Sequence, residues 1–213
     1  MPFDEVYLHE LAEQLRGKGV QLEDGLSDDE INRTEKEYAI NFPPDLRMLL
    51  KFVLPISEGF PNWRTGLATR PITEWEDGTL VVRGHKLIPI SDRFAWPSEG
   101  ICSDVEKSDF WVDAWGPRPS SLSAALETAK KQIAATPRLI PIYEHRYIPS
   151  EPLTSGNPVF SVYQTDVIYY GNDLADYFAR EFGVSRPEWA AKQPREIRFW
   201  SRLSAPTISR RSR

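Results

Sequence analysis

The fold is decided by residues 25–50, GLSDDEINRTEKEYAINFPPDLRMLL. Ser27 is followed three residues later by Glu30, the spacing at which a serine and a glutamate cap a helix start reciprocally. Pro43 and Pro44 then interrupt the helical pattern, and proline suits the first turn of a new helix. Apolar residues recur at helical spacing after them: Leu46, Leu49, Leu50 and Val53. We therefore predict one helix from residue 28 to about residue 38 and a second from residue 44 to about residue 53.

Working outward from this stretch, helical spacing of apolar residues predicts three further helices, over residues 6–15, 121–135 and 173–183. From residue 59 to residue 115 the pattern indicates short strands and turns. Two strands are expected there, 79–82 and 86–90, the first of them following an Asp77–Gly78 hairpin turn. Two more are expected at 159–163 and 167–170, both rich in β-branched and aromatic residues. These elements predict an α+β protein.

A short motif occurs twice, as Leu-Ile-Pro-Ile at residues 87–90 and again at residues 139–142. The physical interpretation is two strands that leave a sheet through similar turns. Proline cannot donate to a strand ladder, so each copy indicates a sheet edge or a bulge.

The composition is that of a globular protein, with 40% apolar and 27% charged residues among 213, a length that suits one domain. Cys102 is the only cysteine, which excludes an internal disulfide and a multi-cysteine metal site. The first 15 residues lack the basic start and apolar core of a signal peptide. No run of about 18 apolar residues is present, so no membrane-spanning helix is expected. A cytoplasmic location is the resulting prediction.

Charge divides the chain unequally. Residues 195–213 hold six arginines against the single acid Glu196, a charge of +5, whereas residues 1–194 hold 20 basic and 30 acidic residues, a charge of −10. We predict a single domain over residues 1–194, followed by a basic, mobile tail over residues 195–213. An acidic body favours a basic protein partner and disfavours nucleic acid and anionic membranes.

The candidate partner-binding surface is acidic with one aromatic residue, and it comprises Glu74, Glu76, Asp77, Asp104, Glu106, Asp109, Trp111 and Asp113. The second part of this set lacks the glycine turn and alternating spacing of a calcium-binding loop. The three histidines are far apart in the sequence, and no nucleotide-binding fingerprint is present. No metal and no cofactor are predicted.

An alternative site is the polar and aromatic cluster of Tyr143, His145, Arg146 and Tyr147. It could form a recognition loop, since tyrosine and arginine anchor interfaces, or the pocket of a small-ligand-binding or enzymatic module. A Cys102–His145 nucleophile pair belongs to the enzymatic reading. In the simplest reading Arg146 pairs with a nearby acid and the tyrosines complete the core.

The stretch quoted first resembles the opening of the SUKH superfamily, which includes fungal Smi/Knr-type cell-wall-assembly regulators and many bacterial proteins. The resemblance rests on the capped acidic helix with Glu30, Ile31 and Glu35, and on the Phe42-Pro43-Pro44-Asp45-Leu46 step into a short apolar helix. Residues 139–152 and 157–178 also look like larger bacterial members. The family's aromatic-Asn-Gly turn is replaced here by Pro55-Ile56-Ser57-Glu58 before Gly59.

The resemblance implies an α+β fold with an antiparallel sheet packed against several helices. It also implies a binding role, because many bacterial members resemble immunity proteins that neutralise toxin domains, and it implies no catalytic residues. The functional prediction is therefore a non-enzymatic protein-binding module, immunity-type or regulatory, that binds and neutralises a basic partner such as a toxin domain.

Overall fold

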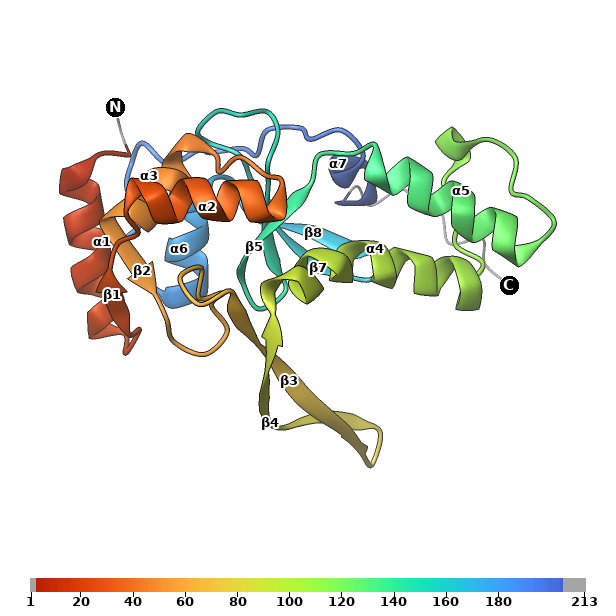
Figure 1. Cartoon of the computed structure of the whole chain (residues 1–213), viewed down its shortest axis with the longest axis horizontal. Coiled ribbons are helices and arrows are strands. Elements are labelled where there is room, and N and C mark those ends of the chain that lie inside the picture. The colour runs from red at the N-terminus through yellow and green to blue at the C-terminus, as the bar shows by residue number, and fades with distance from the viewer. Residues whose placement is uncertain (1–2, 205–213) are drawn as a thin grey trace.

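The computed structural model describes residues 3–204, leaving aside the side chains of Trp75 and Leu80, and shows an α+β fold with antiparallel sheets (Figure 1). The helices are α1 (Glu5–Gly17), α2 (Asp28–Tyr38), α3 (Pro44–Phe52), α4 (Ile90–Lys107), α5 (Leu122–Ala134), α6 (Leu174–Phe182) and α7 (Trp200–Ser204), with a 3-10 turn, η1, at Asp113–Trp115. The strands are β1 (Leu22–Asp24), β2 (Val53–Pro55), β3 (Leu67–Glu76), β4 (Thr79–Pro89), β5 (Leu139–Tyr143), β6 (Arg146–Pro149), β7 (Val159–Tyr163) and β8 (Asp166–Gly171). The α+β class expected from the sequence is confirmed.

Residues 25–50 fold as their local chemistry requires. The side chain of Ser27 accepts from the backbone N–H of Glu30, and the Glu30 carboxylate accepts from the backbone N–H of Ser27, completing the capping box. Helix α2 ends at a left-handed residue, Ala39, and α3 begins with Pro44 in its first turn. Both predicted helices are confirmed.

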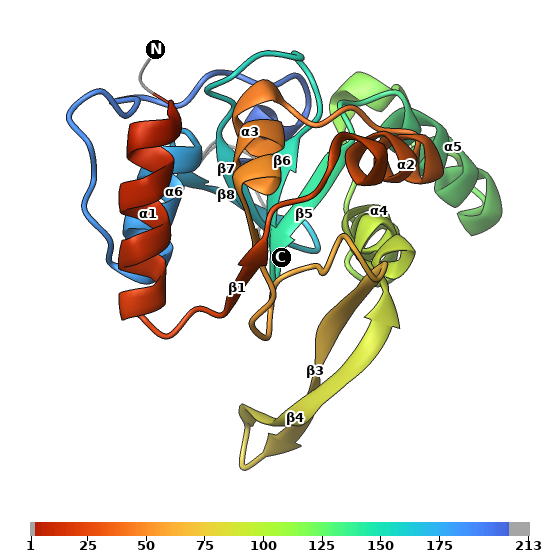
Figure 2. The same cartoon turned by 60° about the vertical axis from the view of Figure 1, so that its left-hand side comes forward.

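The central sheet has the strand order β5-β6-β7-β8, and its two faces are covered by different helices (Figures 1 and 2). Side chains alternate between the faces, as the pleat of a strand requires. Ile140 and Ile148 join the larger core with α1, α2, α3 and α6, while Leu139 and Tyr147 join the smaller core with α4, α5 and α7. The sheet therefore separates two apolar cores within the described residues.

The segment from residue 59 to residue 115 is not the expected run of short strands and turns. Residues 90–107 form the 18-residue helix α4, which contains Pro97. Buried side chains at helical spacing hold it against the sheet and α5: Ile90, Arg93, Pro97, Ile101 and Val105. Tertiary packing thus outweighs the cost of an internal proline, which removes one backbone hydrogen bond.

The strand expected at 86–90 is likewise corrected, because residues 79–89 form one continuous strand and residue 90 already belongs to α4. The two Leu-Ile-Pro-Ile copies therefore differ, since the first leads into a helix. The second lies in β5, an edge strand whose register shifts between Pro141 and Tyr143. The expected edge position is confirmed for both prolines, because β4 belongs to a two-stranded sheet, and the second copy also has the bulge.

The expected tail does not begin at Arg195. Residues 195–204 pack against the face of the sheet that carries the smaller core. Four of their side chains are buried: Ile197, Phe199, Trp200 and Leu203. The indole N–H of Trp200 donates to the carbonyl of Pro137 at 2.7 Å, and Arg195 donates to Asn157 at 2.8 Å. The segment was predicted to be a tail because of its many arginines, although its apolar residues are spaced so that they can pack in a core. The rest of the predicted tail, residues 205–213, lies outside the described residues.

Candidate protein-interaction site

A long hairpin of β3 and β4 projects from the body of the molecule and is its most prominent exposed element (Figures 1 and 2). The two strands pair with each other along their whole length and with no other strand among the described residues. Its turn is the expected Asp77–Gly78 pair, both residues having positive φ (46° and 79°), as a tight hairpin turn requires. Its root is anchored through the buried Ala68 and Ile88, and farther out His85 in β4 pairs with Glu58 in the body.

Both outer edges of this hairpin are interrupted. Pro71 in β3 has no backbone N–H, and β4 carries a bulge where its register shifts opposite Ile72 and Thr73. Such features protect exposed edges against strand addition. The hairpin is therefore suited to contact a partner through its side chains.

The exposed side chains along the hairpin include both apolar and charged residues. Four aliphatic residues are exposed: Leu67, Ile72, Val82 and Leu87, the last at 68%. Two of the predicted acidic residues, Glu74 and Glu76, form ion pairs with Arg83, which lies across from them. Asp77 at the tip is exposed. The tip thus carries three acids and one arginine.

The remaining predicted acidic residues lie elsewhere, at the end of α4 and in the loop after it, and the hairpin tip points away from them (Figure 1). Asp104 accepts hydrogen bonds from the backbone N–H and the hydroxyl of Thr165, at 3.1 and 2.6 Å. Asp109 pairs with Arg118. These two carboxylates therefore have structural partners within the chain.

The other three members of this second group have different settings. Glu106 and Asp113 are exposed, the latter in the η1 turn. Trp111 is half-buried, and its indole N–H donates to the carbonyl of Gly116 at 2.7 Å. The eight residues of the predicted surface are thus divided between two regions.

The alternative cluster, Tyr143 to Tyr147, occupies the turn between β5 and β6. Arg146 donates to Glu181 at 2.7 Å and to Ser161 at 3.0 Å, and its guanidinium lies 3.7 Å from the ring centroid of Tyr170. Tyr147 is fully buried and donates to the carbonyl of Arg93 at 3.0 Å. The ring of Tyr143 packs on Phe60 and Phe182. Arg146 therefore has the acidic partner of the simplest reading, and the tyrosines pack in the core.

The pair proposed for nucleophilic chemistry is not assembled. Cys102 lies on α4 against the smaller core, and its burial raises the pKa of the thiol, which disfavours the reactive thiolate. His145 instead contacts Glu144 and Arg146. Burial, reinforced by Arg146 and Arg93, lowers the pKa of His145 to about 4, so its imidazole is neutral at pH 7.

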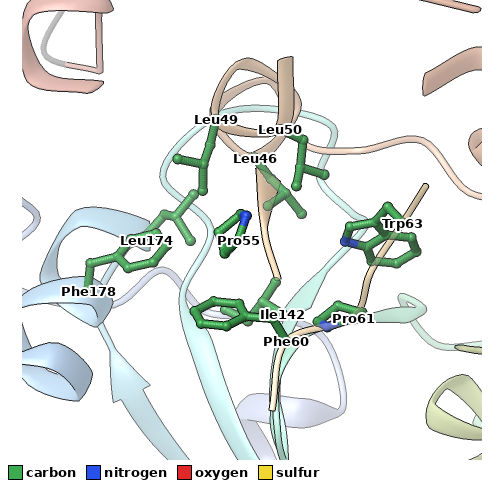
Figure 3. Close-up of a pocket in the computed structure, with 10 residues that line it drawn as sticks. All are labelled: Leu46, Leu49, Leu50, Pro55, Phe60, Pro61, Trp63, Ile142, Leu174 and Phe178. Atoms are coloured by element: carbon green, nitrogen blue, oxygen red, sulfur yellow. The ribbon is translucent and has the colours of Figure 1, made fainter. Parts of the chain in front are cut away.

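Two hollows in the described part of the chain lie away from this cluster, and neither is lined by Tyr143, His145 or Arg146. The first, beneath α3, has a volume of about 20 Å³, enough for a single water, and apolar walls (Figure 3). Its lining residues are Leu46, Leu49, Leu50, Pro55, Phe60, Pro61, Trp63, Ile142, Leu174 and Phe178. The second, about 690 Å³, is an open groove beside α1 and α3 with a mixed lining that includes Met48, Lys51 and Leu153.

Sequence reasoning missed the basic residues of the hairpin and of α4, namely Arg70, Arg83, Lys86 and Arg93. The Asp77–Gly78 turn gave the signal that could have placed the first three, because it sets the pairing of residues before and after it. Arg93 had no such signal, since α4 was not expected.

Within residues 3–204, no three His, Cys, Asp or Glu side chains converge in a way that could hold a metal ion. None of the described helices combines the length and apolarity needed to cross a bilayer. No protein-family model matches the chain, and searches of curated proteins and of solved structures returned no match. The resemblance to the SUKH superfamily stays a prediction.

Proposed function

We propose that this protein is a protein-binding module and that the β3–β4 hairpin is its principal contact with the partner. One observation carries the proposal: a hairpin of 10- and 11-residue strands is held to the body at its root and through the His85–Glu58 pair, and it exposes aliphatic and charged side chains along its length. An isolated two-stranded hairpin buries little apolar surface, so its length is poorly explained by folding alone. Contact with another protein would bury Ile72, Val82 and Leu87.

The partner we propose is a basic protein, which the chain binds in an immunity-type or regulatory role in the cytoplasm. The charge of −10 over residues 1–194 and the excess of acid at the hairpin tip support this choice, since complementary charge accelerates association. Asp77 has no ion-pair partner among the described residues, and Glu74 and Glu76 share one arginine. We propose no catalytic step, cofactor or metal for this role.

The alternative, a small-ligand or enzymatic pocket near Tyr143, His145 and Arg146, has weaker support. Arg146 already donates to Glu181 and Ser161, and neither hollow reaches this cluster. A ligand there would have to displace the Glu181 carboxylate.

The test compares the full chain with a shortened hairpin in capture of partners from the native cell. Residues 71–85 are replaced by Asn-Gly, which joins the cross-strand neighbours Arg70 and Lys86 through a two-residue turn. We expect the full chain to retain a basic protein that the shortened variant loses while circular dichroism and thermal unfolding show an intact body. Equal recovery of the same partner by both proteins would remove the hairpin from the proposal.

A second pair of variants separates charge from shape. Glu74→Lys with Glu76→Lys reverses two charges on the hairpin, and Glu10→Lys with Glu127→Lys makes the same change at exposed positions on α1 and α5. With the captured partner in hand, association at low salt should slow at least about tenfold more for the first pair. Equal effects of the two pairs would show that only net charge matters.

A further inference from the structure

Three cations gather where the hairpin joins the body, and none of them forms an ion pair within the described part of the chain. Arg70 on β3 and Lys86 on β4 are exposed and lie directly opposite each other in the strand register. Like charges in this position destabilise a strand pair. Arg93 lies in the first turn of α4, which follows β4 at the root (Figure 2). This grouping leaves three neighbouring cations without an ion-pair partner among the described side chains.

Arg93 is the most informative member because its side chain is completely buried. Its Nη1 donates to the carbonyl of Thr69 in β3 at 3.0 Å, whereas Nε and Nη2 have no hydrogen-bond partner among the described residues. Buried guanidinium groups are normally paired, since an unpaired buried charge is unfavourable. The two unpartnered nitrogens form one edge of the guanidinium fork, the edge that binds a carboxylate or phosphate through two parallel hydrogen bonds.

The two arginines of the group share an aromatic neighbour. The guanidinium of Arg93 lies 4.8 Å from the ring centroid of Trp96, and that of Arg70 lies 5.3 Å from the same ring. The Trp96 indole therefore brings the exposed Arg70 of β3 and the buried Arg93 of α4 together. The exposed Arg70 and Lys86 and the buried guanidinium of Arg93 therefore belong to one local site.

No side chain in the described part of the chain forms an ion pair with these three cations. Arg146 is already paired with Glu181, and His145 is neutral at pH 7. Glu144 attracts the Arg93 guanidinium without forming an ion pair with it, and the nitrogen within 4 Å of its carboxylate belongs to His145, at 3.9 Å. Tyr147 donates its hydroxyl to the backbone carbonyl of Arg93 at 3.0 Å and also lies close to the guanidinium, but its pKa of about 12 keeps it uncharged at pH 7.

We propose that the root of the hairpin binds a small oxyanion, a phosphate or a carboxylate, held by the Nε–Nη2 edge of Arg93 and balanced by Arg70 and Lys86. Because Arg93 is completely buried, binding requires a local shift of the hairpin root that opens a path to its guanidinium. The inference is independent of the proposed partner-binding role, and the shortened hairpin keeps all three cations.

The experiment is a titration of the full chain with sodium phosphate and, separately, with sodium acetate, at constant ionic strength set by sodium chloride. Isothermal titration calorimetry gives Kd, and the thermal midpoint gives a second readout. We expect saturable binding of at least one probe, weakened about tenfold by Arg93→Lys, which keeps the charge and loses the fork. The preferred probe identifies which oxyanion the site takes.

Exposed-residue variants keep the test decisive if Arg93→Lys does not fold. Arg70→Gln and Lys86→Gln should each weaken binding several-fold, whereas Arg33→Gln, the same charge change at an exposed site on α2, should leave Kd unchanged. Absence of saturable binding of both probes would overturn the proposal. So would wild-type affinity in both Arg70→Gln and Lys86→Gln, or an equal loss in Arg33→Gln.

Discussion

Replacing Arg146 with methionine tests whether the cluster between β5 and β6 is part of the core. The side chains of Arg146 and Glu181 are only 10% and 13% exposed, so the change leaves a nearly buried carboxylate without its cation. Removing one partner of a buried ion pair costs about 3–5 kcal/mol. Methionine retains the aliphatic packing and the pair is not fully enclosed, so we expect about 3 kcal/mol. With a urea m-value of about 2–3 kcal/mol/M, the unfolding midpoint should fall by about 1 M or more.

The pH dependence of this loss gives an independent check. Burial already raises the pKa of Glu181 above its ordinary value of 4.5, against the opposing effect of Arg146. Without Arg146 the folded-state pKa rises further, so the variant gains stability by protonation below about pH 4.5 and loses it as the pH increases. The difference from wild type should therefore be smaller at pH 4 than at pH 7.

A matched variant identifies the cause. Glu181→Gln removes the carboxylate, and combining it with Arg146→Met should restore part of the lost stability, because no unpaired charge remains buried. A loss below about 1 kcal/mol at pH 7, or a loss that does not depend on pH, would refute this account. Arg146 would then be free to serve a ligand, as the alternative function requires.

Four further changes are tested by urea denaturation. Ser27→Ala breaks the capping box and should cost about 1 kcal/mol. Glu30→Gln should flatten the acid dependence between pH 4.5 and 2, where wild type loses stability, because hydrogen bonds from Arg64 and Ser27 lower the pKa of Glu30 to about 2. Gly25→Ala should cost about 2 kcal/mol or more, since a Cβ there overlaps the carbonyl of Lys51. Trp200→Ala should cost about 3–5 kcal/mol by emptying the smaller core, and an unchanged midpoint would contradict the packing of residues 195–204.

The local chemistry of the sequence predicted the elements that depend on near neighbours. Ser27 and Glu30 cap a helix through contacts three residues apart, and Asp77–Gly78 forms its turn with two residues of positive φ. Helix α4 could not be predicted in this way. Its internal Pro97 is a local signal for a break, and the burial that overcomes it comes from strands and a helix distant in the sequence.

The candidate site was only partly predictable for the same reason. Glu74, Glu76 and Asp77 could be recognised as acidic residues near a turn, but the length of the hairpin depends on pairing that extends back to Leu67 and Pro89. That Asp104 is engaged by Thr165 is a contact across 61 positions, which composition cannot reveal. Net charge thus indicated the sign of the surface without showing which acids are free to bind.

The position of α7 has a consequence for synthesis of the chain. The smaller core draws four buried side chains from residues 197–203. The larger core is built entirely from residues up to Ala190 and can form first as the chain leaves the ribosome. α4 and α5 can already cover part of this core, but the part of the sheet that α7 packs against, on β8, stays uncovered until residue 203 has emerged. A stalled or truncated product ending before that point would expose apolar surface on the sheet and would be prone to aggregation or degradation.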